Sequence, residues 1–145
     1  TLDQHHLKSP MFWPIVRSAA GAVREYNLAG LSAESKVPYF LAYEGDEPIG
    51  MQTFLLPGHT PSIVEPEGTV YLFDGVMEPA ARSSGTGTRL LAHTMAWANG
   101  AGFERCCLHF ASPNPSGAPF WLGHSFIPVE HTMVRRINER VLWAR

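Results

Sequence analysis

The chain has 145 residues, of which 45% are hydrophobic and 17% are charged, a composition typical of one soluble globular domain. Its formal net charge of −2 gives no basic surface, which argues against a nucleic-acid partner. The sequence contains no apolar run near the roughly 20 residues that span a membrane and no secretory signal. A cytoplasmic protein is expected, in which the adjacent Cys106 and Cys107 are reduced thiols.

The first segment of the chain is predicted to be mostly helical. The main helix is expected to begin near Pro14, because proline suits a first helical turn, and to end around 27–30. Residues 1–13 contain no convincing strand and are predicted to form a tail. Residue 1 is Thr rather than Met, so the chain is expected to be a fragment or a processed product.

Three strands are predicted next. The strands at 39–44 and 48–56 form a hairpin around Gly45-Asp46-Glu47, and a loop rich in proline and glycine over 57–68 leads to the third strand at 69–77. Regular alternation along this third strand predicts two faces. One face would carry Val70, Leu72, Asp74 and Val76, and the other would carry Tyr71, Phe73, Gly75 and Met77.

The second half of the chain is predicted to alternate between helices and strands. The expected elements are an amphipathic helix over 87–99, a strand over 104–111, a short helix over 116–122, a last strand over 125–137 that bends at Pro128, and a helical tail over 138–145. This order indicates an α/β fold with a mixed central sheet and helices on both faces.

The turn between the third strand and the long helix carries the clearest functional signal. Arg82-Ser-Ser-Gly85-Thr-Gly87 leads directly into a helix N-terminus, which presents unpaired amides and the positive end of a dipole. Gly85 and Gly87 allow a ligand to approach the backbone closely because they have no Cβ. Leu90 stands where a dinucleotide-binding motif has its third glycine, and the turn lacks the lysine of a P-loop.

The turn resembles the Arg/Gln-x-x-Gly-x-Gly/Ala signature of the GNAT family of N-acetyltransferases. A second family signature, an asparagine followed by a short helix and an aromatic ending, resembles Asn114, Phe120-Trp121 and Phe126. Asp74 stands eight residues before Arg82, as in many members. The resemblance implies a single GNAT domain over 1–145 in which the family's first strand is missing.

The resemblance further implies acetyl-CoA as the acyl donor, an amine on a small molecule or a protein as the acceptor, direct transfer between them, and no metal. In such folds the sheet splays apart, here between the strands at 69–77 and 104–111, and the pantetheine arm pairs with the strand before the turn. The residues implied to bind acetyl-CoA are Gly75, Val76, Met77, Arg82, Ser83, Ser84, Gly85, Thr86, Gly87, Thr88 and Asn114.

The usual catalytic groups of the family are not matched. Phe73 stands where members often have a glutamate base, and Trp121 stands where they often have a tyrosine acid. Tyr71 and His109 are the candidate substitutes, because a hydroxyl and an imidazole near the slot can move protons. The alternatives are a core tyrosine and a structural histidine.

The end of the chain also resembles a particular group within the family. The tail over 135–144 is similar to the end of two-domain bacterial members, so a second GNAT domain is expected upstream, and homodimerisation is a further expectation. Two functions stay open: an acetyl-CoA-dependent N-acetyltransferase, and a non-catalytic CoA-binding or interaction module of a larger acetyltransferase-like protein.

Overall fold

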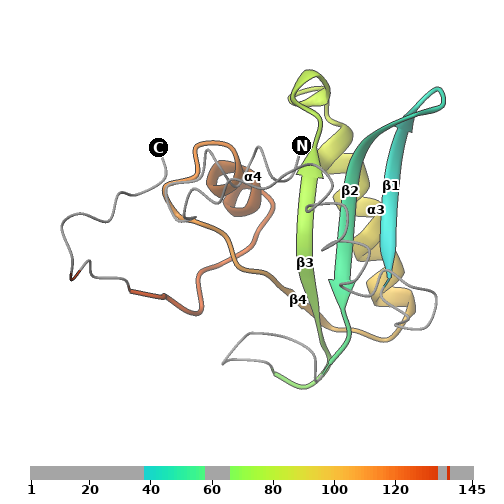
Figure 1. The fold of residues 1–145 in the computed structure, drawn as a ribbon. Helices are drawn as coiled ribbons and strands as arrows, with labels where there is room; N and C mark the ends of the chain where they lie inside the picture. Colours follow the sequence, from blue (N-terminus) through green and yellow to red (C-terminus); the bar gives the residue numbers. More distant parts are fainter. Residues whose placement is uncertain (1–37, 58–65, 134–136, 138–145) are drawn as a thin grey trace.

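The computed structural model describes residues 38–57, 66–133 and 137, and this part of the chain is built on a four-stranded mixed sheet (Figure 1). The strands lie in the order β1 (Tyr39–Glu44), β2 (Glu47–Leu55), β3 (Thr69–Met77) and β4 (Arg105–Cys107). The first three are antiparallel neighbours, and β4 runs parallel to β3. The helices are α3 (Thr86–Gly100) and α4 (Gly117–Gly123), with a 3-10 turn, η1 (Pro79–Ala81), before α3.

The hairpin, the third strand and both described helices confirm the predictions made for them to within one or two residues. Gly45 in the hairpin turn has a φ of +59°, a left-handed conformation that glycine adopts without steric cost. The helix predicted from Pro14 and the helical tail predicted over 138–145 lie outside the described residues.

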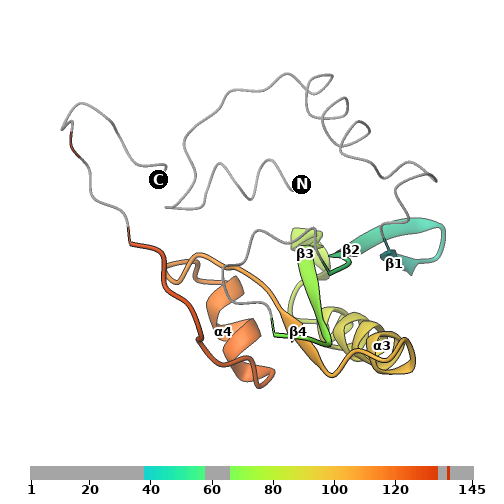
Figure 2. The same cartoon turned by 90° about the horizontal axis from the view of Figure 1, so that it is seen from below.

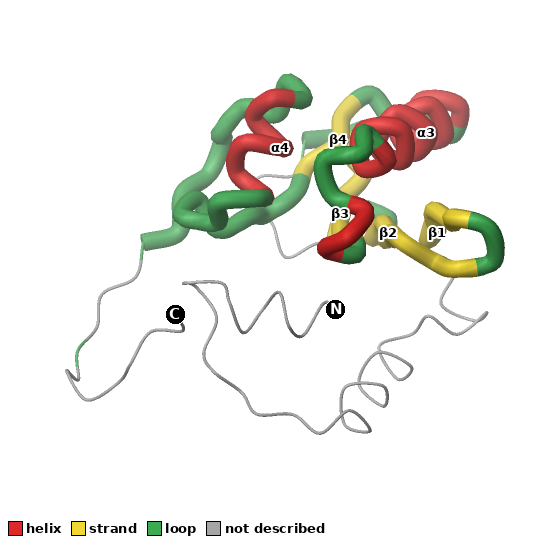
Figure 3. Tube along the Cα trace, turned by 90° about the horizontal axis from the view of Figure 1, so that it is seen from above, coloured by secondary structure: helices red, strands yellow, loops and turns green. Residues whose placement is uncertain are grey.

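Both described helices lie on the same side of the sheet (Figures 2 and 3). α3 packs against β2 and β1 and buries Leu91 and Ala98, which lie two helical turns apart on one face. α4 contributes Trp121 to the same core. Burying a side chain of leucine size stabilises a fold by about 2 kcal/mol. The buried apolar core on this side consists of Phe54, Val70, Leu72, Leu91, Ala98 and Trp121.

A β-bulge at Phe73 interrupts β3. Thr53 of β2 pairs with Asp74, and the next residue, Phe54, pairs with Leu72, so Phe73 is the extra residue between them. The Asp74 amide donates a hydrogen bond to the Thr53 hydroxyl at 3.2 Å beside the bulge. The Phe73 side chain is left 51% exposed.

The bulge changes which residues of β3 face α3. Opposite residues of an antiparallel pair share a face, and Gly75 is opposite Gln52, whose Oε1 lies 2.6 Å from the hydroxyl of Thr94 on α3. Leu72 belongs to the buried core on this same side. Leu72 and Gly75 therefore share a face although they are three residues apart, and the regular alternation predicted for the strand is wrong beyond Phe73.

β3 and β4 pair along only part of their length. The parallel ladder joins Thr69–Tyr71 to Arg105–Cys107, after which β3 continues to Met77 while the chain that follows β4 leaves the sheet (Figure 1). The predicted splay between these two segments is therefore confirmed. The predicted length of the fourth strand, 104–111, is wrong because no neighbouring strand pairs with 108–111 among the described residues.

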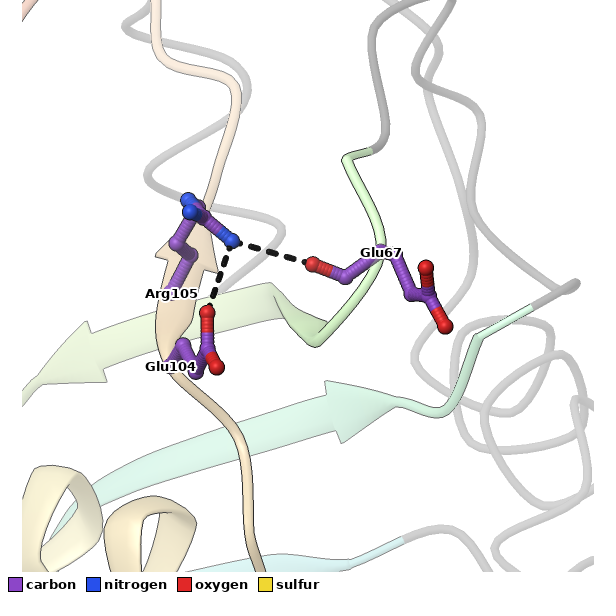
Figure 4. A network of polar contacts seen from close by, with 3 residues as sticks. All are labelled: Glu67, Glu104 and Arg105. Atoms are coloured by element: carbon purple, nitrogen blue, oxygen red, sulfur yellow. Dashed lines mark hydrogen bonds and ion pairs between the residues drawn. The ribbon is translucent and has the colours of Figure 1, made fainter.

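At the closed end of the splay, where β3 and β4 pair, backbone hydrogen bonds provide most of the contact. The amides of Glu104 and Arg105 both donate to the carbonyl of Gly68, at 2.8 and 3.2 Å. The Arg105 guanidinium also donates to the Glu67 carbonyl at 3.0 Å and meets the Glu104 carboxylate at 3.2 Å (Figure 4). An exposed ion pair of this kind contributes under about 1 kcal/mol, so the backbone bonds hold the strands together at this end.

The strand predicted over 125–137 is also wrong for the residues that the structure describes. The chain over 125–133 has no regular structure. Ser125 has a φ of +67°, and the Phe126 amide turns back to the Trp121 carbonyl at 3.3 Å. Pro128 has no N–H to donate to a ladder. An alternating apolar pattern does not make a strand where no partner strand lies beside it.

Candidate functional site

The turn between β3 and α3 leaves the first amides of the helix without helical partners. Gly85 precedes α3 with a φ of +80°, and the first α-helical bond runs from the Arg89 amide to the Gly85 carbonyl at 3.0 Å. The amides of Gly87 and Thr88 therefore have no helical acceptor, whereas the Thr86 amide donates to the Ser84 hydroxyl at 3.4 Å. This end of the helix can accept an anion.

Side-chain hydroxyls hold the turn in shape. Ser84 donates to the Ala81 carbonyl at 2.8 Å, and its Oγ lies 2.9 Å from that of Thr86. Ser83 adopts a φ of +62°, a conformation uncommon for a residue with a Cβ. The hydrogen bond between Ser84 and Ala81 closes the segment between η1 and α3.

Two guanidinium groups flank this turn. The Nε of Arg82 donates to the Met77 carbonyl at the end of β3, at 3.1 Å. Arg89 donates from Nη2 to the Thr86 hydroxyl at 2.9 Å. Sequence reasoning named Arg82 but not Arg89, which lies outside the motif. Both cations are exposed and available for a phosphate group.

Neighbouring side chains pack closely against two glycines beside the turn. A Cβ on Gly87 would lie 3.5 Å from the Phe120 ring and 3.6 Å from Met77. A Cβ on Gly75 would lie 3.2 Å from the indole of Trp121, although Gly75 itself is exposed. Both glycines thus allow neighbouring side chains to pack directly against the backbone of β3 and α3.

The predicted site residues of β3 lie along its unpaired edge. Gly75, Val76 and Met77 are its last three residues and pair with β2, and no strand pairs with them on the β4 side among the described residues. Between Tyr71 and Met77 the strand runs roughly 20 Å. The splay therefore leads from the glycine turn down to Tyr71.

A hydrogen-bonded histidine joins α3 to α4 beside the turn. His124 lies 2.7 Å from the Phe120 carbonyl through Nδ1 and 3.0 Å from the Thr88 hydroxyl through Nε2. A carbonyl only accepts, so neutral His124 carries its proton on Nδ1 and accepts from Thr88 through Nε2. The sequence suggested a surface or second-layer residue for His124, because no motif marks this contact.

Asn114 lies before α4 and caps it. Its Oδ1 accepts from the amides of Ser116 and Gly117 at 3.0 and 3.1 Å, which satisfies two amides at the helix N-terminus. Only 9% of Asn114 is exposed. The side chain predicted to bind the pantetheine end therefore also positions the helix that carries Trp121.

The structure brings together the two residues that were named for proton transfer. The Tyr71 hydroxyl lies 2.6 Å from Nδ1 of His109. Tyr71 is 3% exposed, and burial raises the pKa of its phenol to about 12, with Cys107 and Asp74 acting in the same direction. The phenol therefore stays protonated at neutral pH. The sequence predicted that His109 lies on the fourth strand, but the structure places it after the end of β4.

A carboxylate that sequence reasoning missed lies on the other side of this histidine. The Oε1 of Glu130 is 3.5 Å from Nε2 of His109, with 18% of the Glu130 side chain exposed. No motif surrounds Glu130, and the segment that carries it had been assigned to a strand. The resulting order is Tyr71, His109, Glu130.

The splayed mixed sheet and the glycine turn that follows it define an α/β protein of the acetyltransferase class. The model of the acetyltransferase (GNAT) family matches residues 5–124, and the chain therefore belongs to this family. No curated protein matches the chain in sequence.

Three solved structures illustrate the likeness of fold. An integron cassette protein from the mobile metagenome of V. cholerae is 21% identical, with 85% of this chain and 75% of that one covered and a TM-score of 0.62. The aminoglycoside N-acetyltransferase AAC(6')-Iy in complex with CoA is 18% identical, with 81% and 89% covered and a TM-score of 0.63.

The third is the aminoglycoside acetyltransferase meta-AAC0020 from an uncultured soil metagenomic sample, in complex with sisomicin. It is 15% identical, with 88% of this chain and 78% of that one covered and a TM-score of 0.61. Likenesses at these identities establish the fold. Among the helices of the described residues, none has the length and apolar character to cross a membrane.

Proposed function

We propose that this protein is an N-acetyltransferase that transfers an acetyl group from acetyl-CoA directly to an amine. The observation that carries the proposal is the junction of two features: the unpaired edge of β3 ends at Met77, and the turn with left-handed Gly85 follows at once. An extended arm can pair with the strand edge while its phosphates lie on the amides of the turn.

The residues that would hold acetyl-CoA divide into three groups. Arg82 to Thr88 would bind the pyrophosphate through the turn and the first amides of α3, with Arg89 as an added cation. Gly75 to Met77 would pair with the pantetheine arm, and Asn114 would bond to its far end. Acetyl-CoA supplies the activated thioester.

Tyr71 and His109 would remove a proton from the acceptor amine. Since the Tyr71 hydroxyl lies 2.6 Å from Nδ1 of His109, Tyr71 can pass its own proton to the imidazole while it takes one from the ammonium. The amine nitrogen then bonds to the thioester carbon, the C–S bond breaks, and the thiolate takes up a proton as the nitrogen loses its next one. Trp121 is buried in the core and has no acidic proton to offer.

A small-molecule amine is the acceptor class that we propose. Support comes from the structural neighbours, of which one is an aminoglycoside N-acetyltransferase and another an aminoglycoside acetyltransferase described with sisomicin. The exposed Phe73 near Tyr71, with ring centroids 6.4 Å apart, would add an apolar wall to the acceptor side. A panel of aminoglycosides, polyamines and amino acids tests the class.

Acetyl-CoA binding tests the turn. Gly85→Glu places a carboxylate against the phosphates and forces a side chain into a left-handed position, so we expect calorimetric acetyl-CoA binding to weaken by at least about 100-fold. Gly45→Glu is the matched control, because Gly45 is also left-handed with a φ of +59° but lies in the hairpin turn. Equal affinity in the two variants would overturn the assignment of the turn.

The second open function, a CoA-binding module without activity, is favoured by Phe73 and Trp121 at the usual positions of the base and the acid. Release of CoA from acetyl-CoA in the presence of the amine panel separates the two functions. Turnover that falls at least tenfold in Tyr71→Phe supports the enzyme. Tight acetyl-CoA binding without turnover on any amine would establish the module instead.

A further inference from the structure

We propose that Glu130 is a positioning residue for proton transfer, which holds and stabilises His109 in a Tyr71–His109–Glu130 chain. The proposal rests on the proposed N-acetyltransferase function and adds a residue that no family motif provides. Its basis is geometric: one ring nitrogen of His109 lies 2.6 Å from the Tyr71 hydroxyl and the other lies 3.5 Å from the Glu130 carboxylate.

The two neighbours of His109, Tyr71 and Glu130, determine which tautomer its imidazole adopts. The Tyr71 phenol stays protonated, so its hydroxyl donates and Nδ1 of His109 accepts. The proton of neutral His109 is then on Nε2, the nitrogen that faces Glu130, and a carboxylate accepts a proton but has none to give. Tyr71 and Glu130 thus select the same tautomer, in which Nδ1 is the basic atom and is aimed at Tyr71.

A proton that reaches Nδ1 makes His109 a cation between a neutral phenol and an anion. The Glu130 carboxylate stabilises this cation, which is the state that the relay must reach when the amine is deprotonated. The His109 side chain is 41% exposed and the Glu130 side chain 18% exposed. Solvent weakens the attraction between His109 and Glu130, so we expect loss of the Glu130 charge to have a smaller effect than loss of a partner in a fully buried ion pair.

The three residues come from three separate parts of the chain. Tyr71 is the last β3 residue in the parallel ladder, His109 follows β4, and Glu130 is in the irregular segment after α4. Within the part of the chain that the structure describes, the other titratable side chains near Tyr71 are Cys107 and Asp74. Both belong to the strands of the splay, so Glu130 is the carboxylate that reaches His109 from outside the sheet.

The first test measures His109 without turnover. In an NMR titration of the histidine ring protons, Glu130→Gln keeps an acceptor beside Nε2 but removes its charge, so the protonation midpoint of His109 should move to lower pH, with proton affinity reduced about threefold. Glu104→Gln is the matched control, because Glu104 is a carboxylate paired with Arg105 at the closed end of the splay. An unchanged midpoint in Glu130→Gln would overturn the pairing.

The second test measures the relay. In acetyl transfer to the best amine of the panel, the rise of kcat/KM with pH should move to lower pH in Glu130→Gln by the same factor, while kcat above the midpoint falls about threefold and KM for acetyl-CoA is unchanged. Glu130→Asp should restore part of kcat. A pH profile that stays in place although the NMR midpoint moves would overturn the role in proton transfer.

The two levels of the proposal fail in different ways. If the wild-type protein binds acetyl-CoA and acetylates no amine, the proposed function fails, and the relay role fails with it. The NMR titration still decides whether Glu130 pairs with His109. A fall in kcat with no change in either pH dependence would assign Glu130 to folding alone and overturn the proposal.

Discussion

The indole of Trp121 stands at the point where a side chain on Gly75 would have to be. A Cβ built on Gly75 would lie 3.2 Å from two carbons of that ring, closer than ordinary van der Waals contact. Trp121 occupies the position where GNAT members often have a tyrosine, and here its ring packs against the strand backbone. The short helix α4 therefore packs against β3 through the contact between Trp121 and Gly75.

Replacing Gly75 should disturb the packing of α4 against β3. We expect Gly75→Val to lower the free energy of unfolding by about 1–3 kcal/mol, because the added carbons meet the indole. Gly100→Ala is the control: a Cβ on Gly100 at the end of α3 meets nothing within 4 Å, and we expect a change within about 1 kcal/mol. Urea denaturation of both variants checks the difference. Equal stability would mean that Trp121 can move aside.

Two buried threonines should respond in opposite ways to the same substitution. The Thr94 hydroxyl lies 2.6 Å from Gln52 Oε1 and 3.0 Å from the Leu91 carbonyl, whereas the buried Thr69 hydroxyl has no hydrogen-bond partner among the described residues. We expect Thr94→Val to destabilise by about 1–3 kcal/mol, because it leaves the Gln52 oxygen unpaired. Thr69→Val should be neutral or stabilising. Thermal and urea unfolding compare the two, and a similar loss in both would contradict the role of the Thr94 bond.

Stability should fall at alkaline pH because two acids, the buried Tyr71 and the partly buried Cys106, resist ionisation. Burial raises the pKa of the Cys106 thiol from 9.0 to about 12 and that of the Tyr71 phenol from 10.0 to about 12. The unfolded chain loses these protons from about pH 9 upward while the folded chain keeps them, so the free energy of unfolding falls as pH rises toward 12.

Variants at the two residues check this alkaline loss. Cys106→Ala and Tyr71→Phe should each reduce the slope of stability against pH, measured by urea unfolding from about pH 8 to about pH 11. Absorbance of the tyrosinate in the folded protein provides a second observation, since the pKa of the Tyr71 phenol is raised from 10.0 to about 12. A slope unchanged in both variants would show that other groups cause the loss.

Asn114 should separate helix capping from ligand binding. Asn114→Ala removes the acceptor for the Ser116 and Gly117 amides and should cost about 1–2 kcal/mol. Asn114→Asp keeps an acceptor oxygen and suits a helix N-terminus, so stability should return. If the Asn114 amide nitrogen binds the pantetheine end, acetyl-CoA affinity stays reduced in Asn114→Asp. Full recovery of both properties would restrict Asn114 to capping.

The fold could be predicted where the local sequence pattern indicated an element and the tertiary structure provided the neighbouring element for it to pack or pair with. The hairpin around Gly45, the helix after Gly85 and the splay follow from turn residues, apolar periodicity and the family resemblance. The strand predicted over 125–137 failed because its apolar pattern has no adjacent strand, which depends on tertiary structure. The bulge at Phe73 carries no glycine or proline to mark it, and it appears only in the register with β2.

The candidate site was predictable to a similar degree. The glycine turn is a local motif, so its residues could be named directly. Tyr71 and His109 could be named separately from their chemistry, but their 2.6 Å contact depends on where the chain goes after β4. Glu130 could not be found in this way, because its segment has neither a motif nor a regular structure.

The extra residue in β3 also determines which changes in chain length the protein can tolerate. A chain that lacked Phe73 would have a regular strand in which Asp74 and Gly75 keep their partners Thr53 and Gln52, and therefore keep their faces. Gly75 would still lie against Trp121, and the turn at Gly85 would still be entered from the same side of the sheet. Natural variation should therefore accept the loss of Phe73 more readily than the loss of Gly75, which would place a side chain against Trp121.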